Sequence, residues 1–429
     1  MNSEGRGTLC VADVVESIVG PGLAVRIEAY DGSVTGDPTA ATTVRIRNRD
    51  AVIRAVQAPG DLGLARAYAA GDIEVEGDIR DVFAAGDEDL TVRIGPRQLR
   101  AVMGLVGRDA LRRIPPPPEE FRPWGRLHSL RRDRASVSHH YDLSNGFYGL
   151  FLDESMTYSC AVFEDNDWTL EQAQAAKHEL ALRKLHLEPG KRVLDVGCGW
   201  GAHAIHAARH FGVEVTGVTV ADQQVDLGRK RVAEAGLGER IDLRLQDWRE
   251  VDDGPYDAIS SIGMFEHVGW QRGPEFLAAM WDLLAPGGRM MLHMITRPDA
   301  RPVRQRSRAR FIYRYIFPDG ELQRIGHIVD QTQVAGFDVI DVDALNQHYA
   351  TTLDHWLDRL EANWDAAVDQ VGLHRARIWR LYLAASASGF HGRRLQVQQI
   401  TAVKAHTDGR TAAPARPDWD PSHLDRYGG

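Results

Sequence analysis

A glycine-rich stretch, VLDVGCGWG at residues 193–201, carries the first signal for chemistry. A β-rich run leads directly into Gly197, Gly199 and Gly201, and a helix-length segment follows. Glycines let the backbone turn sharply and approach a ligand closely at the carboxyl end of a strand. A nicotinamide fingerprint would read GxGxxG, whereas this stretch reads GxGxG with Asp195 inside the strand. The stretch therefore favours a nucleotide-like ligand, with a plain tight turn as the structural alternative.

The elements that must position this loop form an alternating series. Short β-rich runs alternate with helix-length segments at residues 192–197, 213–220, 241–246, 256–263, 288–295, 337–342 and 395–403. Alternation of this kind is typical of an α/β fold, with a parallel sheet covered by helices on both faces. We predict a doubly wound seven-stranded sheet whose last strand could enter antiparallel. Helical segments are expected before the sheet, from Ser138 to Leu187, and as insertions at 296–336 and 344–392.

The spacing of the glycines, with an acid inside the strand, resembles motif I of class I S-adenosylmethionine methyltransferases. In that class the second strand usually ends in an acid that holds the ribose hydroxyls. Here that strand ends in TVADQQ at residues 219–224, so the acid is absent from its usual place. Thr219 and Gln224 can instead exchange hydrogen bonds with the ribose or the amino-acid portion. We predict Thr219, Val220 and Gln224 as residues that bind S-adenosylmethionine.

The third strand ends in Gln246, Asp247 and Trp248. An amide or carboxylate at this place can meet the adenine amine, and an indole can pack on the face of the base. We therefore predict that these three residues bind the adenine end of the cofactor. A capped strand end with a core tryptophan is the structural alternative.

Several other segments carry a more specific resemblance. HHYDLSNGFYGLFLDESMTYSCAVF at 139–163, MFEHVG at 264–269, LHMI at 292–295, YIFPDGEL at 315–322 and HYATTL at 348–353 stand in this order along the chain. Together with the glycine loop they closely resemble the cyclopropane fatty acid synthase family, over about residues 40–400. The N-terminal stretch, with GDLGLARAYAAGDIEVEGD at 60–78, looks like the leader domain of that family.

The resemblance implies methyl transfer from S-adenosylmethionine to the double bond of an unsaturated acyl chain on a membrane phospholipid. An alkene is a poor nucleophile with no proton to remove beforehand, so the sulfonium methyl must be held in line with the π bond. Attack leaves a carbocation, which needs a dry pocket with π faces and no competing nucleophile. A base must then remove a proton from carbon, and the resemblance implies bound bicarbonate as that base.

Carried over residue by residue, the resemblance implies a set of functional side chains. The bicarbonate site maps onto Cys160, Glu266, His293, Tyr349 and the backbone of Ile295. Tyr158 and Ser159 are expected at the carboxylate end of the cofactor, and His140 and Tyr141 near the active centre. Taken singly, His293, Glu266 and Cys160 also fit structural roles, as a satisfied buried histidine, a residue near a helix N-terminus and a core thiol.

Departures from the family pattern bear on the product. The family often has an aromatic residue at Val162, a cysteine at Ser386, and Thr-Ile-Gly where this chain has Met294-Ile295-Thr296. Loss of a proton from the transferred methyl would close a cyclopropane, whereas a hydride shift followed by loss would leave a methylene. We favour the 10-methylene product, a precursor of 10-methylstearate, because residues 58–78 look most like the actinobacterial branch that makes methyl-branched chains. Cyclopropane formation is the alternative, and a separate reductase is a candidate partner for the methylene product.

The composition limits the wider interpretation. The chain has 429 residues with a formal net charge of -9, which argues against a nucleic-acid partner along its whole length. Its three cysteines, Cys10, Cys160 and Cys198, are widely spaced, so neither a disulfide framework nor a structural zinc site is expected. We expect no metal. No apolar run is long enough to span a membrane, and the start lacks the pattern of a signal peptide, so we expect a cytoplasmic protein.

Two local clusters of arginine modify this interpretation. Arginines stand at 297, 301, 304, 306, 308, 310 and 314, and again at 122, 126, 131, 132 and 134. Clusters of this kind can dock on anionic phospholipid headgroups, although a solvated arginine-rich loop is the structural alternative. We therefore expect peripheral association with the inner face of the cell membrane. A homodimer is left open.

Four regions are predicted from these patterns. Residues 1–114 are expected to form a small α+β leader domain, and 115–135 a Pro/Arg-rich linker around PPPP at 115–118. Residues 136–404 are expected to form the catalytic domain, and 405–429 a disordered tail. The rival functions are a methyltransferase acting on N or O of a small metabolite, an RNA methyltransferase and a non-catalytic lipid-binding protein. None of them accounts for the set Cys160, Glu266, His293 and Tyr349.

Overall fold

The computed structural model describes most of the chain. The described residues are 10–19, 23–84, 96–107, 109, 112–122, 127–129, 131–133, 136, 143–300 and 310–411. They divide into two compact units, of which the first contains residues 1–122, 304–318 and 364–388 and the second contains the rest. The predicted catalytic region 136–404 therefore supplies segments to both units. The predicted tail falls mostly outside the described residues.

The first unit is a small α+β structure, as the sequence predicts for the N-terminal region. Its four-stranded sheet has the order β2-β1-β3-β4, from strands Arg26–Ala29 (β1), Val34–Gly36 (β2), Thr43–Ile46 (β3) and Ile73–Glu76 (β4). Its helices are Val11–Val19 (α1), Arg49–Gln57 (α2), Asp61–Ala70 (α3), Ile79–Ala84 (α4), Pro96–Val106 (α5), Trp364–Val371 (α15), most of Leu373–His391 (α16) and the π-helix Ile312–Ile316.

A network of hydrogen bonds holds the first unit together. Arg66 of α3 donates two hydrogen bonds of 2.7 Å to the Glu120 carboxylate, which also accepts one from the Tyr315 hydroxyl. Glu120 is buried, so its negative charge is stabilised by this bidentate pair. The polyproline stretch thereby ends on an ion pair that fixes it to α3 and to the π-helix.

The second unit contains the predicted seven-stranded sheet, with the order β10-β11-β9-β8-β5-β6-β7. The strands are Arg192–Val196 (β5), Glu214–Thr219 (β6), Ile241–Leu245 (β7), Tyr256–Ile262 (β8), Leu284–Thr296 (β9), Asp338–Ala344 (β10) and Gln396–Val403 (β11). Each corresponds to one of the seven predicted runs. The last strand, β11, pairs antiparallel with both β9 and β10, which is the orientation that the sequence allowed for it. The other described pairings in this sheet are parallel.

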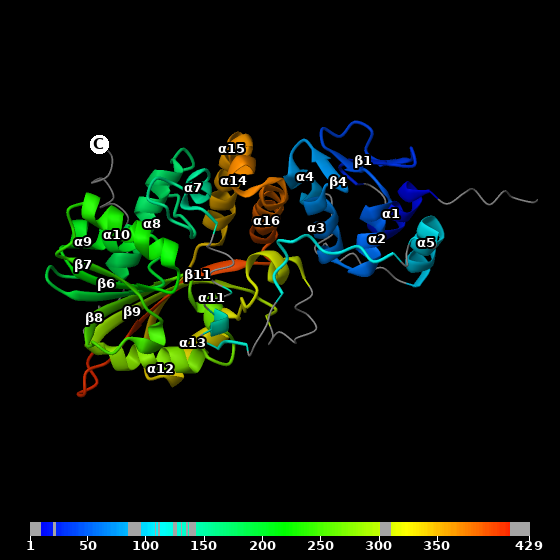
Figure 1. The fold of residues 1–429 in the computed structure, drawn as a ribbon. Coiled ribbons are helices and arrows are strands. Elements are labelled where there is room, and N and C mark those ends of the chain that lie inside the picture. The colour runs from blue at the N-terminus through cyan, green and yellow to red at the C-terminus, as the bar shows by residue number, and fades with distance from the viewer. Residues whose placement is uncertain are drawn as a thin grey trace, which may run out of the picture. The chain divides into compact units, whose positions relative to one another are not determined.

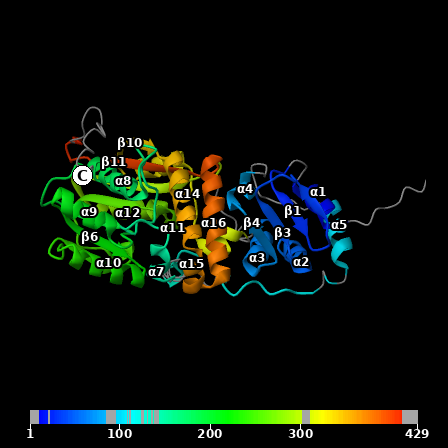
Figure 2. The ribbon, with the colours of Figure 1, turned by 90° about the horizontal axis from the view of Figure 1, so that it is seen from above.

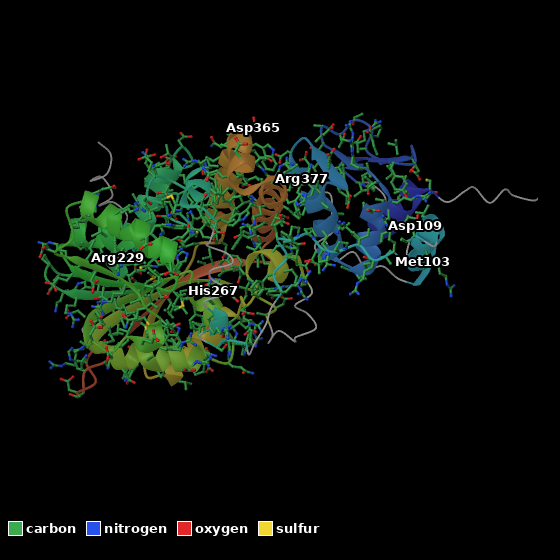
Figure 3. The ribbon with its side chains drawn as sticks, in the orientation of Figure 1. Met103, Asp109, Arg229, His267, Asp365 and Arg377 are labelled. Atoms are coloured by element: carbon green, nitrogen blue, oxygen red, sulfur yellow. The ribbon has the colours of Figure 1, made fainter. Side chains whose placement is uncertain are left out.

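Helices cover both faces of this sheet (Figures 1 and 2). They are Asn145–Gly149 (α7), Leu170–Lys184 (α8), Ala202–Phe211 (α9), Asp222–Glu234 (α10), Phe265–Val268 (α11), Gly273–Leu283 (α12), Ile325–Val334 (α13) and Asn346–Ala362 (α14). One hydrophobic core packs α8, α9 and α10 on the sheet, and a second packs α12 and α13 on the other face. Arg229, labelled in Figure 3, fixes α10 to the sheet through the Leu243 carbonyl at 2.9 Å.

Alternation along β9 decides which residues face which helices. Met290, Leu292 and Met294 belong to the core of α12 and α13, whereas Met291 belongs to the core of α8 and α9. Successive side chains of a strand point to opposite faces, so His293 lies on the same face as Met291. His293 therefore faces α8 and α9.

The prediction of helix from Ser138 to Leu187 is wrong for its middle part. Residues 150–169 are irregular, between α7 and α8. The Asp153 carboxylate accepts hydrogen bonds of 2.9 Å from the backbone N–H groups of Ser155 and Thr157, which competes with helix formation. Thr169 then starts α8 with a capping box that includes Gln172. Among the described residues no helix combines the length and the apolar content needed to cross a membrane.

Candidate active site

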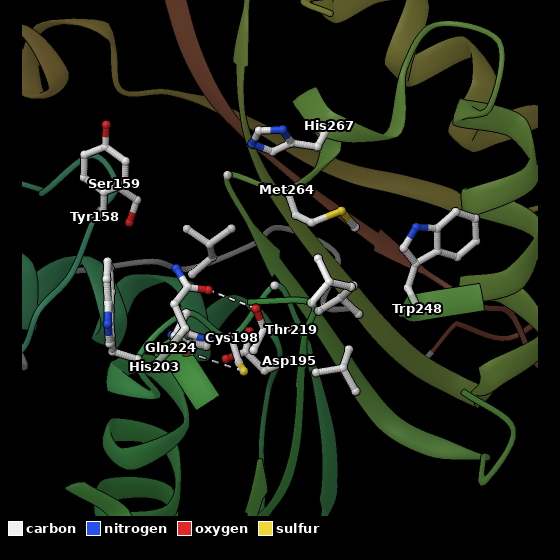
Figure 4. A pocket seen from close by; sticks show the side chains of 18 of the residues that line it. Tyr158, Ser159, Asp195, Cys198, His203, Thr219, Gln224, Trp248, Met264 and His267 are labelled. Atoms are coloured by element: carbon white, nitrogen blue, oxygen red, sulfur yellow. Dashed lines mark hydrogen bonds between the residues drawn. The ribbon is translucent and has the colours of Figure 1, made fainter. Parts of the chain in front are cut away.

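A pocket opens at the carboxyl ends of β5, β6 and β8, where a doubly wound sheet binds its ligands. Eleven of the predicted cofactor residues line it: Tyr158, Ser159, Asp195, Gly197, Gly199, Thr219, Val220, Gln224, Gln246, Asp247 and Trp248. Gly201 follows the lining residue Trp200 and precedes α9 as its N-cap. In Figure 4, Trp248 lies at one side of the pocket, and Tyr158, Ser159 and His203 lie at the other. The strand ends therefore meet as the sequence predicts.

The glycine loop requires its glycines. Gly197 has a φ of +85°, and a Cβ atom there would lie 2.9 Å from the Cβ of Met264. The N–H groups of Gly197 and Cys198 donate to the Val218 carbonyl at 2.9 and 3.1 Å, so the loop folds over the end of β6. Since Met264 also lines the pocket, a side chain at residue 197 would displace part of the wall.

Asp195 lies at the base of the pocket with one oxygen unused. Its Oδ1 accepts a hydrogen bond of 3.2 Å from the Ser260 hydroxyl, while Oδ2 is buried without a hydrogen-bond partner among the described residues. Burial raises the pKa of this carboxyl to about 7. A buried acceptor without a partner is costly, so the site fits a ligand that donates a hydrogen bond there.

The two side chains predicted for the ribose contact each other. The Thr219 hydroxyl donates to Gln224 Oε1 at 2.9 Å, from the end of β6 to the start of α10 (Figure 4). The amide nitrogen of Gln224 is thereby left to donate elsewhere. The arrangement keeps a polar donor at the middle of the pocket, between Trp248 and Tyr158.

On the side of the pocket formed by the end of β7, Asp247 and Trp248 have the structural roles that the sequence offered as the alternative: a strand-end cap and a core tryptophan. Asp247 caps the 3-10 helix Trp248–Glu250 (η2) and accepts from Arg249 Nε at 2.7 Å. Trp248 is part of the core and packs edge-on against Phe276 with ring centroids 5.1 Å apart. Both residues also line the pocket, so their structural roles do not exclude contact with the cofactor.

Glu266 and Ile295, which the resemblance assigns to the bicarbonate site, contact each other. Glu266 lies on α11, and its Oε1 accepts a hydrogen bond of 2.7 Å from the Ile295 N–H of β9. Its Oε2 is buried and has no hydrogen-bond partner among the described residues. Burial raises the pKa of Glu266 to about 7. The Ile295 amide, predicted to face an anion, therefore fixes the Glu266 carboxylate.

His293 lies two residues before Ile295 on β9. Its Nδ1 lies 3.2 Å from the side-chain nitrogen of Gln399, while its Nε2 is buried without a hydrogen-bond partner among the described residues. Burial, together with the positive charge of Lys177, lowers the pKa of His293 to about 3. The imidazole is therefore neutral at physiological pH.

Cys160 and Tyr349 are joined through α14. The Cys160 thiol lies 3.1 Å from the Ala161 carbonyl and 3.8 Å from the Leu345 carbonyl, and Tyr349 stands one turn after Leu345. Burial raises the pKa of the Cys160 thiol, so the group is a neutral donor and no nucleophile. In the described part of the chain, the lining of the pocket does not include Cys160, Glu266, His293 or Tyr349. His140 and Tyr141 lie outside the described residues.

Several residues that line the pocket were not predicted from the sequence. Lys177 and His178 of α8, His203 of α9, Met264 and His267 all face the pocket. The signal for Lys177 lies in the spacing of α8, where residues 170, 174, 177, 181 and 184 form one helical stripe. Gln174, Lys177 and Lys184 are polar members of that stripe, which is buried. No group of three or more His, Cys, Asp or Glu side chains among the described residues could hold a metal ion.

Comparisons with known proteins point in one direction. Residues 128–400 match the family described as mycolic acid cyclopropane synthetase. The chain is 40% identical to the probable fatty acid methyltransferase Rv3720 of Mycobacterium tuberculosis, over 97% of this chain and 99% of that protein. It is 37% identical to the tuberculostearic acid methyltransferase UfaA1 of the same organism, over 89% of this chain and 88% of that protein.

Solved structures agree with the sequence relatives. The cyclopropane synthase MmaA2 from Mycobacterium tuberculosis matches with a TM-score of 0.60 and 36% identity, over 63% of this chain and 97% of that one. The mycolic acid cyclopropane synthase CmaA1, complexed with SAH and CTAB, matches with a TM-score of 0.59 and 39% identity, over 63% and 97%.

Proposed function

The chain belongs to the mycolic acid cyclopropane synthetase family and is an S-adenosylmethionine-dependent methyltransferase, and from this premise we propose which reaction it catalyses. It transfers a methyl carbon to the cis double bond of an unsaturated fatty acyl chain carried by a membrane phospholipid. The observation that carries this proposal is that two buried polar atoms, Glu266 Oε2 and His293 Nε2, have no hydrogen-bond partner among the described residues, while His267, next to Glu266 in the chain, lines the cofactor pocket.

In this proposal, different residues of the pocket bind different parts of the cofactor. S-Adenosylmethionine supplies an electrophilic methyl group on a sulfonium sulfur. Trp248 and Asp247 take the adenine end, Thr219 and Gln224 the ribose, and the loop of Tyr158 and Ser159 the amino-acid end. The unused Oδ2 of Asp195 accepts from a donor of the bound cofactor. The glycine loop lets the backbone approach the cofactor without a side chain between them.

The surroundings of Glu266 suit deprotonation of a carbon acid. Transfer to an alkene needs no base beforehand, but the resulting cation must lose a proton from carbon in a site without water. We propose that Cys160, His293 and Tyr349 hold a bicarbonate ion, which supplies the base, and that Glu266 accepts its hydroxyl proton. The Ile295 N–H keeps Glu266 Oε1 in place, which leaves Oε2 to accept that proton. The neutral imidazole of His293 can donate to an anion from Nε2.

We propose that the product is the 10-methylene chain, the precursor of 10-methylstearate. The name of the relative UfaA1, a tuberculostearic acid methyltransferase, supports this choice, whereas the names of MmaA2 and CmaA1 support the cyclopropane alternative. Lipids from a host that lacks cyclopropane synthases and expresses only this chain distinguish the two. We expect acyl chains heavier by one CH2 that take up hydrogen over a mild catalyst, as an exocyclic alkene does. A saturated ring of the same mass would still show methyl transfer to the double bond, but the product would then be a cyclopropane and not the methylene chain.

We also propose that the enzyme works at the surface of an anionic membrane. Arg132 is not free for this purpose, because it forms a buried bidentate ion pair with Asp319 at 2.7 and 2.8 Å, whereas the pair of Arg297 with Asp299 is exposed and weak. The arginines at 126, 134, 301, 304, 306 and 308 lie outside the described residues. Sedimentation with vesicles tests the proposal: we expect binding to anionic vesicles that weakens with salt, and little binding to neutral ones. Equal binding to both, at all salt concentrations, would contradict it.

A further inference from the structure

Lys177 is a buried lysine on which two carboxylates, Asp153 and Asp195, act only at longer range. It lies on α8 with 1% of its surface exposed, and its Nζ is 3.3 and 3.5 Å from the two ring nitrogens of His178. No carboxylate of the described residues lies within ion-pair distance of this Nζ. Burial lowers the pKa of Lys177 to about 7. A buried ammonium without a counter-ion is strongly unfavourable, so the position needs an explanation.

Lys184 of the same helix shows how the chain otherwise stabilises such a group. Its side chain is fully buried, and its Nζ forms ion pairs with Asp341 at 3.3 Å and Asp343 at 3.0 Å. The two lysines stand two turns apart on one stripe of α8. Lys184 has two carboxylates within ion-pair distance, whereas Asp153 and Asp195 act on Lys177 only at longer range, so the position has room for a directly bound anion from outside the chain.

The neighbours of Lys177 place its ammonium at one side of the pocket. Gln174, one turn earlier on α8, donates to the Ser159 carbonyl at 2.9 Å and so fixes the loop of Tyr158 and Ser159 to this helix. Figure 4 shows that loop on the side of the pocket opposite Trp248. Lys177 itself lines the pocket. An extended ligand with its base near Trp248 would therefore bring its other end to Lys177.

The two described arginines of the pocket wall already have carboxylate partners. Arg249 donates to Asp247 and Asp133, and Arg272 pairs with Glu275. The histidines at 178, 203 and 267 all have lowered pKa values because they are buried, so they carry no charge near pH 7. Within the described part of the chain, Lys177 is thus the lining cation that remains for an anion.

We propose that the Lys177 ammonium binds the carboxylate of the methionine portion of S-adenosylmethionine. This inference rests on the proposed function and assigns one group of the cofactor to one residue of the chain. An ammonium–carboxylate hydrogen bond at a buried lysine is among the stronger polar contacts. Bicarbonate is the competing anion, because Lys177 acts electrostatically on Cys160 and His293; Lys177, however, lines the cofactor pocket and those two residues do not.

Calorimetric titration with the reaction product and with one analogue of it tests the assignment. One is S-adenosylhomocysteine, and the other is its decarboxylated form, which keeps the amino group. For Lys177→Met we expect the Kd of S-adenosylhomocysteine to rise by about 10- to 100-fold, because one charge-assisted contact is lost. The Kd of the decarboxylated ligand should stay close to its wild-type value, so the preference for the carboxylate disappears. Lys177→Arg, which keeps a cation, should retain part of that preference.

Lys184→Met is the matched control on the same helix. It should lower the melting temperature, because it leaves Asp341 and Asp343 without their cation, and it should keep the wild-type preference between the two ligands. Lys177→Met should not lower the melting temperature of the free protein, since no ion pair is broken; Lys177→Gln serves if the methionine variant does not fold. An equal effect of Lys177→Met on both ligands, or no effect on either, would overturn the assignment. Failure of the wild-type chain to bind S-adenosylhomocysteine would instead overturn the proposed function.

Discussion

Glu266→Gln is expected to lower kcat by roughly 10²- to 10⁴-fold, the range typical of losing one acid–base group. Glutamine keeps an oxygen that can accept from the Ile295 N–H, which now donates to Glu266 at 2.7 Å, so the local structure should survive. It removes the ability of Oε2 to take up a proton. Affinity for S-adenosylhomocysteine should stay near the wild-type value, since Glu266 does not line the cofactor pocket. Single-turnover rates and calorimetry on the two proteins measure both quantities.

The same substitution should change the dependence of stability on pH. Burial raises the pKa of Glu266 from 4.5 to about 7. The folded protein therefore holds a proton that the unfolded chain has lost, and this contribution is complete below about pH 4.5 and is lost as the pH rises through about 7. The melting temperature of Glu266→Gln relative to wild type should rise over this window. Glu234→Gln, the same change on the exposed end of α10, is the control for both experiments. Wild-type turnover by Glu266→Gln would exclude a part for this carboxylate in the reaction.

Gly197→Ala is expected to weaken binding of S-adenosylhomocysteine by about 10- to 100-fold. An alanine at a φ of +85° adds backbone strain of about 1–2 kcal/mol, and its Cβ would meet the side chain of Met264 at 2.9 Å. Relief of that contact moves either the loop or Met264, and both line the pocket. Calorimetric titration gives the loss of affinity, and thermal unfolding gives the loss of stability.

Gly190→Ala is the control that distinguishes the effect of backbone strain from the effect of a changed pocket. Gly190 has a φ of +82°, and a Cβ there would have no atom within 4 Å. It lies between α8 and β5 and does not line the pocket. We expect a similar loss of stability and unchanged affinity for the ligand. If both variants lost affinity equally, strain in the fold would explain the result and the loop would have no direct part in binding.

The strands were predictable from the sequence because each run is short, β-rich and bounded by helix-length segments. The same reasoning failed for residues 150–169, where apolar residues at helical spacing compete with side chains that bind the backbone. Asp153 closes a turn through the N–H groups of Ser155 and Thr157, and Gln174 of α8 fixes the Ser159 carbonyl. The Asp153 turn is local, with partners two and four residues later, whereas the contact of Gln174 with Ser159 comes from a separate helix, which a local pattern does not contain.

The site was predictable where geometry follows from topology. Parallel strands end at the same edge, so the residues after β5, β6 and β7 had to meet, and they line one pocket. Lys177 and His203 lie on helices, where the face turned to the pocket depends on how each helix packs. The functional parts of Glu266, His293, Cys160 and Tyr349 came from the family resemblance, and they stay predictions. The resemblance assigned Glu266 and Ile295 to one site, but neither it nor any spacing in the sequence predicted the hydrogen bond between them.

Transfer of a labelled methyl group by the purified chain tests the central claim most directly. The assay combines S-adenosylmethionine carrying a CD3 group with vesicles of an oleoyl phospholipid, and mass spectrometry follows the acyl chain. We predict that the acyl chain gains one carbon that keeps two of the three deuterium atoms, because the methylated cation must lose one from the transferred group. A product that keeps all three would contradict loss of the proton from the transferred methyl group, whereas a label on the headgroup or an unlabelled lipid would contradict methyl transfer to the double bond.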